Sequence, residues 1–157
     1  MDNADLRILD MLQRDARATQ SEIARAVGLS QPAVAERIRK LEERQIITGY
    51  AARVDAVELG VDITAFIGVA IEHPRFFARF AKVVQDLDEI LECHRVAGED
   101  SYLLKVKTRN TRSLDRLLVE VLRTIPGVTR TQTTIVLASI KEESYVRAPG
   151  PDDGGQS

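Results

Sequence analysis

The sequence predicts an α+β fold, in which an N-terminal helix-turn-helix domain is joined by a strand linker to a ferredoxin-like βαββαβ domain. Three observations lead to this prediction. Residues 19–41 have the caps and spacing of two short helices around a tight turn. Residues 45–54 are rich in β-branched side chains, as a connecting strand would be. From residue 63 onward, strand-like and helix-like segments follow in the order β-α-β-β-α-β.

Composition excludes several classes of protein. The 157 residues are 44% hydrophobic and 29% charged, which is ordinary for a globular protein. No apolar run approaches the roughly 20 residues that span a bilayer, and the start Met1-Asp2-Asn3 lacks a basic region, so we expect a cytoplasmic protein with no membrane partner. With one Cys and two His, no disulfide, metal or cofactor is expected.

Charge is informative only locally. The net charge is −2, and residues 1–55 contain nine basic and nine acidic residues. Between Gln31 and Arg53, however, five basic side chains stand against three acidic ones. Any nucleic-acid interface therefore has to be local, and the excess lies within the helix-turn-helix and the residues that follow it.

The domain of residues 1–45 contains three predicted helices. The first runs from Asp5 to Arg14, with Leu6, Ile8, Leu9 and Leu12 near one side. Thr19 and Glu22 stand three apart and form a capping box that opens the second helix, which Gly28 ends. Ser30 begins the third helix as its N-cap, and an early proline follows.

The outer face of the third helix is a candidate DNA-reading surface, because Val34, Ile38 and Leu41 fix the opposite, buried side. If this helix enters a major groove, its N-terminal half reaches base edges. The candidate base readers are Gln31, Ala33 and Glu36, and the candidate phosphate contacts are Arg37, Arg39 and Lys40, with Gln20, Ser21 and the cap Ser30 near the backbone. The alternative is an ordinary solvated face of a helix bundle.

Residues 46–62 form the predicted linker, with a strand up to Val54 and a short turn within 55–62. Residues 63–145 form the second domain. Its predicted strands are 63–71, 90–96, 102–108 and 128–141. Its predicted helices are 75–87 and a second one that starts at Thr111 or Ser113 and ends at Ile125. Both helices should lie on one face of one antiparallel sheet. We expect a second copy of the domain to cover the other face, and residues 146–157 to be disordered.

No catalytic machinery is evident, and an enzyme is not expected. His73 and His94 are the only imidazoles, and neither lies in a familiar catalytic pattern. Cys93 and His94 are neighbours on a strand, so their side chains point to opposite faces and cannot easily share a metal. Neither a GxGxxG segment after a strand nor a Walker loop is present.

Short segments of the chain carry a family resemblance. They are Asp5-Leu-Arg-Ile-Leu9, Val27-Gly-Leu-Ser30, Glu36-Arg-Ile-Arg-Lys-Leu-Glu42, Ile46-Ile-Thr-Gly-Tyr50, Glu92-Cys-His94 and Ile125-Pro-Gly-Val128. With the predicted order of domains, they make residues 2–145 resemble the Lrp/AsnC, or feast/famine, family of transcriptional regulators. The resemblance implies a homodimer with paired linker strands, often assembled into an octamer, that binds palindromic operators in double-stranded DNA.

The resemblance also implies an amino-acid effector bound in the second domain, chiefly by the loop between its second and third strands. The candidate residues are Val96, Ala97, Gly98, Glu99, Asp100, Ser101 and Tyr102, with Thr133 and Thr134 from the last strand. Many family members have Asp directly before the Tyr, where this chain has Ser101. Gly98 exposes amides for a carboxylate, and Glu99 or Asp100 suits an ammonium. The alternative is an acidic turn in water.

Two other functions compete with that of a regulator. Sirohaem decarboxylases resemble the same architecture, and His94 with Arg95 would then face a tetrapyrrole. An effector-binding partner that has lost DNA binding is the other alternative, although the intact capped motif argues against it.

Overall fold

The computed structural model describes residues 1–147 as two compact units, which we treat separately. The helical unit comprises Met1–Arg53 together with residues 141–147, and the sheet unit comprises Val54–Ile140. The sequence predicted that residues up to 145 belong with the sheet. Residues 141–147 group instead with the helices. Most of the predicted disordered tail lies outside the described residues.

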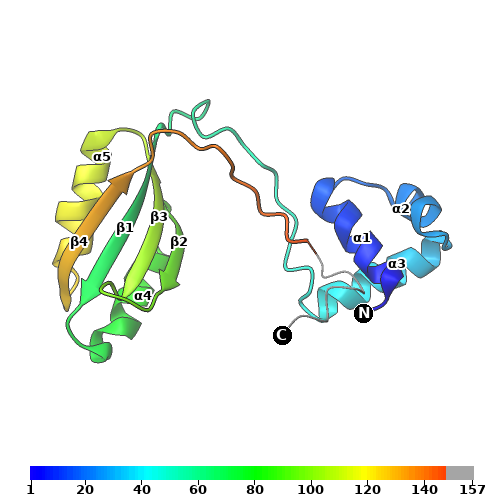
Figure 1. Ribbon diagram of the computed structural model, residues 1–157, viewed down its shortest axis with the longest axis horizontal. Helices are drawn as coiled ribbons and strands as arrows, with labels where there is room; N and C mark the ends of the chain where they lie inside the picture. Colours follow the sequence, from blue (N-terminus) through cyan, green and yellow to red (C-terminus); the bar gives the residue numbers. More distant parts are fainter. Residues whose placement is uncertain (148–157) are drawn as a thin grey trace. The chain divides into compact units, whose positions relative to one another are not determined.

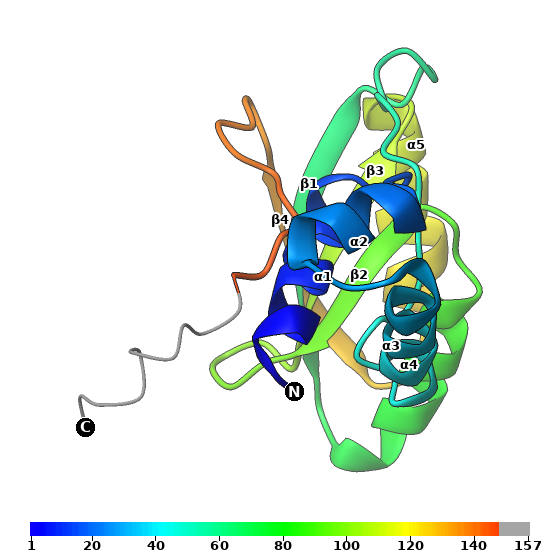
Figure 2. The same ribbon diagram turned by 90° about the vertical axis from the view of Figure 1, so that its right-hand side faces the viewer.

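The helical unit contains α1 (Asn3–Arg14), α2 (Gln20–Val27) and α3 (Gln31–Glu43), shown in Figure 2. The predicted capping box of α2 is confirmed, with Thr19 and Glu22 bonded to each other's backbone amides, and Gly28 ends the helix at φ 71°. Ser30 caps α3 as predicted. A second capping box, between Asp2 and Asp5, was missed, and it moves the start of α1 two residues earlier than predicted.

A small apolar core holds the three helices together. Ile8 of α1, Ile23 and Ala24 of α2, and Val34 and Leu41 of α3 are buried. The predicted inner side of α3 is therefore confirmed at Val34 and Leu41, and its opposite side is left facing solvent.

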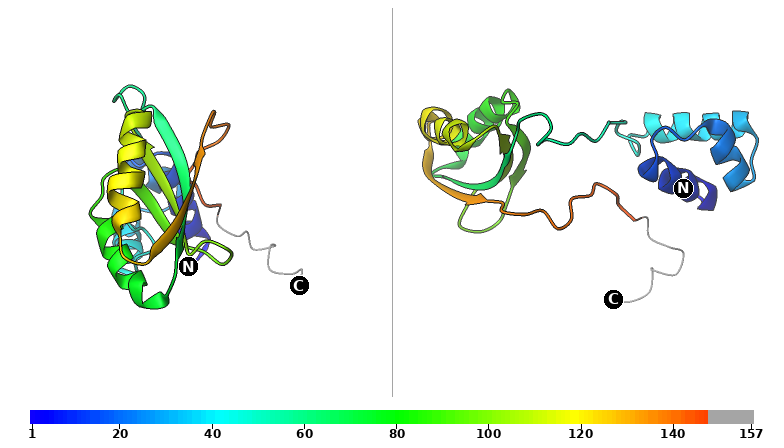
Figure 3. Two further views of the ribbon diagram at one scale, coloured as in Figure 1. Left: turned by 90° about the vertical axis from the view of Figure 1, so that its left-hand side faces the viewer. Right: turned by 90° about the horizontal axis from the view of Figure 1, so that it is seen from above.

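The sheet unit is the predicted ferredoxin-like fold. Its strands are β1 (Ile63–Ile71), β2 (Ile90–Arg95), β3 (Tyr102–Thr108) and β4 (Val128–Ile135), paired antiparallel in the order β2-β3-β1-β4. Helices lie on one face (Figures 1 and 3). They are η1 (Pro74–Phe76), α4 (Phe77–Gln85), α5 (Thr111–Arg116), and the π and 3-10 turns Leu117–Val121 and Leu122–Thr124 that continue α5.

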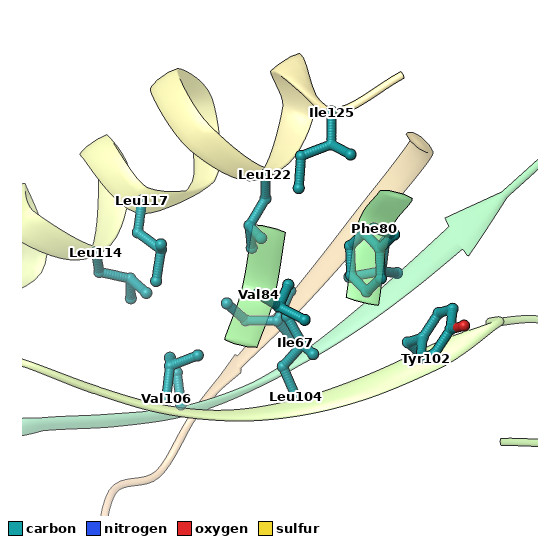
Figure 4. Packing of buried hydrophobic residues seen from close by; sticks show 12 residues of the cluster. Ile67, Phe80, Val84, Tyr102, Leu104, Val106, Leu114, Leu117, Leu122 and Ile125 are labelled. Atoms are coloured by element: carbon teal, nitrogen blue, oxygen red, sulfur yellow. The ribbon is translucent and has the colours of Figure 1, made fainter. Parts of the chain in front are cut away.

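Alternate residues of the central strands form the core beneath these helices. Ile67 and Leu104 point toward Leu117 and Leu122 of the second helical segment, and Phe80 of α4 fills the space above Tyr102 (Figure 4). The Phe80 and Tyr102 rings lie 4.8 Å apart between centroids. Phe80 is thus part of the core. Within the described sheet unit, no helix lies on the other face of the sheet.

The uncovered face is more polar than the sequence prediction assumed. Phe66 and Leu103 are its large apolar side chains, at 37% and 38% exposure. Around them, register and alternation place polar residues on the same face, including Glu92, His94, Lys105, Arg130, Gln132 and Thr134. Lys105 forms an ion pair with Glu92 at 3.5 Å. The face is therefore an apolar centre within a charged surround.

Two predicted strands differ from the structure. Residues 44–62 form turns but no strand within the chain, because a strand needs a neighbour to complete its ladder of hydrogen bonds. The last strand ends at Ile135 rather than at residue 141. Its partner β1 begins at Ile63, so only Val136 finds a further acceptor, the Thr64 carbonyl at 2.9 Å. Beyond it, Leu137 is 97% exposed.

Candidate nucleic-acid interface and effector site

The N-terminal half of α3 presents the predicted base readers. The Ser30 hydroxyl accepts a hydrogen bond from the Ala33 amide at 3.3 Å and so fixes the start of the helix. Gln31 is exposed and makes no side-chain hydrogen bond to any described residue. Ala33 is half-buried. This end of α3 therefore offers a free amide beside a small side chain.

Glu36, in contrast, is tied to its own helix. Two nitrogens of Arg39 donate to its carboxylate at 2.7 and 2.9 Å, and Lys40 lies 3.4 Å away. Arg39 also donates to Glu43. The hydrogen bonds from Arg39 lower the pKa of Glu36 to about 2, so it stays ionised through the physiological range. Two of the three predicted phosphate contacts, Arg39 and Lys40, and the predicted base reader Glu36 thus form a single network in the free protein.

Arg37 lies elsewhere than predicted. Its guanidinium donates to Asp2 at 2.8 Å and to Asp5 at 2.7 Å, and these two ion pairs join α3 to the N-terminus of α1. The bond to Asp5 is the main cause that raises the pKa of Arg37. In the free protein this charge holds the two helices together, and the predicted phosphate contact of Arg37 would require both ion pairs to break.

The start of α2 is arranged as predicted. Gln20 is exposed and Ser21 half-buried in its first turn. The Thr19 hydroxyl and amide both donate to the Glu22 carboxylate at 2.7 Å, which lowers the pKa of Glu22. The backbone N–H of Gln20 lies in the first turn of α2, where N–H groups have no acceptor within the helix and can therefore bind an anion.

The loop between β2 and β3 is fixed by backbone hydrogen bonds. The Val96 amide donates to the Ser101 carbonyl at 3.1 Å, and the Ser101 amide donates to the Val69 carbonyl at 2.8 Å. The Ser101 hydroxyl accepts from the Ile71 amide at 3.1 Å. The serine that stands where many family members have aspartate therefore attaches the loop to β1. Gly98 adopts φ 149° at the loop tip.

Two residues that the sequence prediction missed determine where this loop lies. Arg130 of β4 donates to Asp100 at 3.0 Å and lies 3.6 Å from Glu99. Gly68 of β1 lies under the Asp100 carboxylate, because a Cβ at Gly68 would come within 2.1 Å of it. An isolated glycine in an apolar strand is itself a signal for such a close approach. A hollow of about 370 Å³ runs beside Arg130 along β4.

Two predicted effector residues are not brought to this site. The Tyr102 ring is buried in the core against Phe77 and Phe80, at centroid distances of 5.5 and 4.8 Å. Thr133 pairs with Ile67 and therefore shares the helix-covered face, whereas Thr134 lies on the open face. Alternation along β4 separates these neighbours, and the sequence alone did not show which of them faces the loop.

A larger cavity, of about 950 Å³, lies at the other end of the sheet unit. It is lined by charged side chains around the end of β3 and the start of α5, including Asp88, Lys107, Arg112 and Arg116, with Leu91 as an apolar wall. The seven residues of β3 put it about 20 Å from the predicted loop. It is a separate candidate for a small-molecule site.

The described residues contain no cluster of three or more His, Cys, Asp or Glu that would hold a metal. Cys93 pairs with Leu104 and His94 with Leu103, so they face opposite sides as predicted. His94 and Arg95 are separated in the same way, since Arg95 stacks on Phe77 at 4.8 Å while His94 bonds Glu92. Within residues 1–147, no helix is long and apolar enough to cross a membrane.

Comparison with known proteins gives consistent similarities. The family profile "Lrp/AsnC ligand binding domain" matches residues 64–146, and "Winged helix-turn-helix DNA-binding" matches residues 1–48. The leucine-responsive regulatory protein of Escherichia coli K12 is 36% identical over 146 residues, which cover 92% of this chain and 89% of that protein.

Solved structures agree with the sequence matches. A transcriptional regulator of Neisseria meningitidis, crystallised as a complex with L-Met, superposes with a TM-score of 0.88 at 29% identity and covers 93% of this chain and 96% of that one. Escherichia coli AsnC superposes with a TM-score of 0.86 at 30% identity, over 92% and 97% of the two chains.

Proposed function

The chain belongs to the Lrp/AsnC family of DNA-binding transcriptional regulators, and from that premise we propose that two copies bind a palindromic operator through α3 and that an amino acid bound beside Arg130 alters this binding. The observation that carries the DNA-binding part is the capped α2–α3 pair, in which the exposed Gln31 side chain makes no hydrogen bond to any described residue. The effector part is supported by the Asp100–Arg130 ion pair, whose Arg130 also lines the hollow along β4.

On DNA, Gln31 and Ala33 approach base edges from the first turn of α3. Lys40 and Arg39 contact phosphate after leaving Glu36, while Gln20, Ser21 and Ser30 offer backbone or hydroxyl groups to the phosphate chain. In this arrangement Glu36 holds the two cations in place before binding. Reading of a base by Glu36 would first require both ion pairs to break.

A second copy covers the open sheet face. Phe66 and Leu103 lie at its centre and would be desolvated, while the charged side chains around them set the register. Residues 46–54, which form no strand in the single chain, would gain a neighbouring strand from the second copy. The dimer then presents two α3 helices to half-sites roughly 34–36 Å apart, or a multiple of that distance. Because the net charge is −2, affinity depends on this bivalency.

The effector acts by exchanging ion pairs. An amino acid has a carboxylate that competes with Asp100 for Arg130, and an ammonium that takes the released Asp100 or Glu99. Asp100 would then move away from Gly68, and the loop from 96 to 101 would shift. A ligand changes operator affinity only if it binds one arrangement of the loop more tightly than the other, and this exchange supplies such a difference.

Replacing Arg39 by alanine tests the phosphate contact. We expect weaker binding to operator and random DNA alike, and a salt dependence whose slope falls by about one per chain, because one phosphate contact is lost. Fluorescence titrations at several salt concentrations measure both. The matched variant Glu36→Gln removes the anchor and a negative charge, so it should strengthen binding to random DNA. Unchanged affinity in both variants would remove this face of α3 from the interface.

Calorimetry with the twenty amino acids tests the effector site. One or more should bind the wild-type protein, and Asp100→Ala or Arg130→Ala should weaken that binding about tenfold or more, since each removes one charge-assisted partner. Arg116→Ala, in the 950 Å³ cavity, is the matched control and should bind normally. Loss in Arg116→Ala alone would place the effector in that cavity, and no binding to the wild type would contradict the proposal.

The decarboxylase alternative is weakened by geometry. The relatives and family profiles are those of transcriptional regulators, which points away from an enzyme. His94 and Arg95 lie on opposite faces of the sheet and therefore do not line one tetrapyrrole site. A visible absorption spectrum of the purified protein that contained tetrapyrrole bands would favour the enzyme.

A further inference from the structure

The chain passes between the two units twice. It leaves the helical unit at Arg53 and returns to it at Lys141. The returning segment of residues 141–147, here named the clasp, does not simply follow the sheet. It is bound to α1, the helix farthest along the chain from the linker.

The contacts between clasp and α1 are specific. Both ends of the Gln13 side-chain amide are used, because Nε2 donates to the Val146 carbonyl at 3.1 Å and Oε1 accepts from the Val146 amide at 2.8 Å. The Tyr145 hydroxyl donates to Asp10 at 2.5 Å and accepts from Arg14 at 3.3 Å. The Arg14 guanidinium also lies 4.9 Å from the centre of the Tyr145 ring. Val146, the first residue of the predicted disordered tail, is thus hydrogen-bonded to α1.

The two connections are also tied to each other at both ends. In the helical unit, the Arg53 guanidinium donates to the Glu142 carbonyl at 2.6 Å. In the sheet unit, the Val136 amide donates to the Thr64 carbonyl at 2.9 Å. The linker and the returning segment therefore connect the two units twice. The linker continues from the end of α3, and the returning segment is bound to α1.

We propose that the clasp orients the α3 helix for operator binding, with Tyr145 and Gln13 as positioning residues. A single extended connection has two soft torsions per residue and lets the attached helices rotate about it. A second connection, anchored on a different helix, opposes that rotation, since the helices can turn only if the anchors break. The proposal rests on the bivalent operator binding proposed above, because orientation matters only when two α3 helices must meet two half-sites.

Operator spacing is the readout that distinguishes positioning from stability. The variant Gln13→Ala/Tyr145→Phe removes the bonds to α1, and a full chain ending at Glu143 removes the clasp's contact residues. A chain ending at Arg147 keeps them and is the matched control. Wild type and control should lose about tenfold or more in affinity when about 5 base pairs are inserted between half-sites. In both clasp variants this loss should shrink to about threefold or less, with affinity for a single half-site unchanged.

A second measurement needs no DNA. In a Cys93→Ser background, spin labels are attached at Arg25→Cys in the helical unit and Arg79→Cys in the sheet unit. Double electron–electron resonance then measures the distance between the two labels. Labelled chains are diluted into unlabelled ones so that only distances within one chain are seen. The distance distribution should broaden in both clasp variants and not in the control. An unchanged distance distribution in the clasp variants overturns the proposal. So does a loss of affinity for a single half-site that equals the loss for the full operator. A wild type without spacing preference contradicts bivalent binding instead, and the distances then decide the role of the clasp alone.

Discussion

Replacing Gln31 by alanine should reduce affinity for the cognate operator by about 1–3 kcal/mol per half-site and leave affinity for random DNA unchanged. Gln31 is exposed in the first turn of α3, the part of a recognition helix that reaches base edges. A glutamine amide can donate to and accept from an adenine edge at once, and no ion pair has to break first. Titrations of operator and scrambled DNA at one salt concentration measure the difference.

The control for Gln31 is Gln85→Ala, an exposed glutamine of α4 in the sheet unit. It should alter neither affinity. An equal loss of Gln31→Ala on operator and random DNA would mean that the residue contacts the backbone and reads no base.

Replacing Gly127 by alanine should destabilise the sheet unit by about 2–4 kcal/mol. Two effects add. The residue has φ 90°, where a side chain is strained, and its Cβ would lie 2.4 Å from the ring of Phe76. Turning the ring would not remove the clash, because the Phe76 Cβ also lies 2.7 Å from the added atom. Chemical denaturation, followed through the transition of the sheet unit, measures the change.

Gly49→Ala is the control, since no described residue other than its chain neighbours comes within 4 Å of the added Cβ and its φ is not positive. Its unfolding midpoint should stay close to that of the wild type. Phe76→Ala together with Gly127→Ala should recover part of the loss by removing the clash. A fully additive double variant would show that backbone strain, and not the ring, accounts for the effect.

Local chemistry explains which elements the sequence predicted well. The helix starts at Thr19 and Ser30 depend on side chains that cap amides three residues later. All the residues that determine each helix start therefore lie within one turn of the helix. The β1 strand matches its predicted range because a short, nearly continuous apolar run that ends at a turn signal is typical of a buried strand. Both signals are short-range and independent of the rest of the fold.

The candidate sites were harder to predict, since their side chains depend on distant partners. From the sequence, Arg37 is a candidate phosphate contact. In the structure it forms ion pairs with Asp2 and Asp5, which lie more than thirty residues earlier in the chain. Asp100 reads as a free carboxylate until Arg130 pairs with it. In both cases the sequence showed a charged side chain that could bind a ligand. Only the folded structure showed that another residue of the chain already pairs with that charge.

By itself, the sequence determined that this protein has a capped helix-turn-helix followed by a βαββαβ domain, because caps, periodicity and turns are encoded locally. Only the tertiary structure decided which side chains are free to bind. It paired Arg37 with Asp2 and Asp5, brought Gly68 and Arg130 to the loop between β2 and β3, and placed Tyr145 on α1. The physical reason is that an ion pair or hydrogen bond depends on distance in space, which a one-dimensional pattern does not contain.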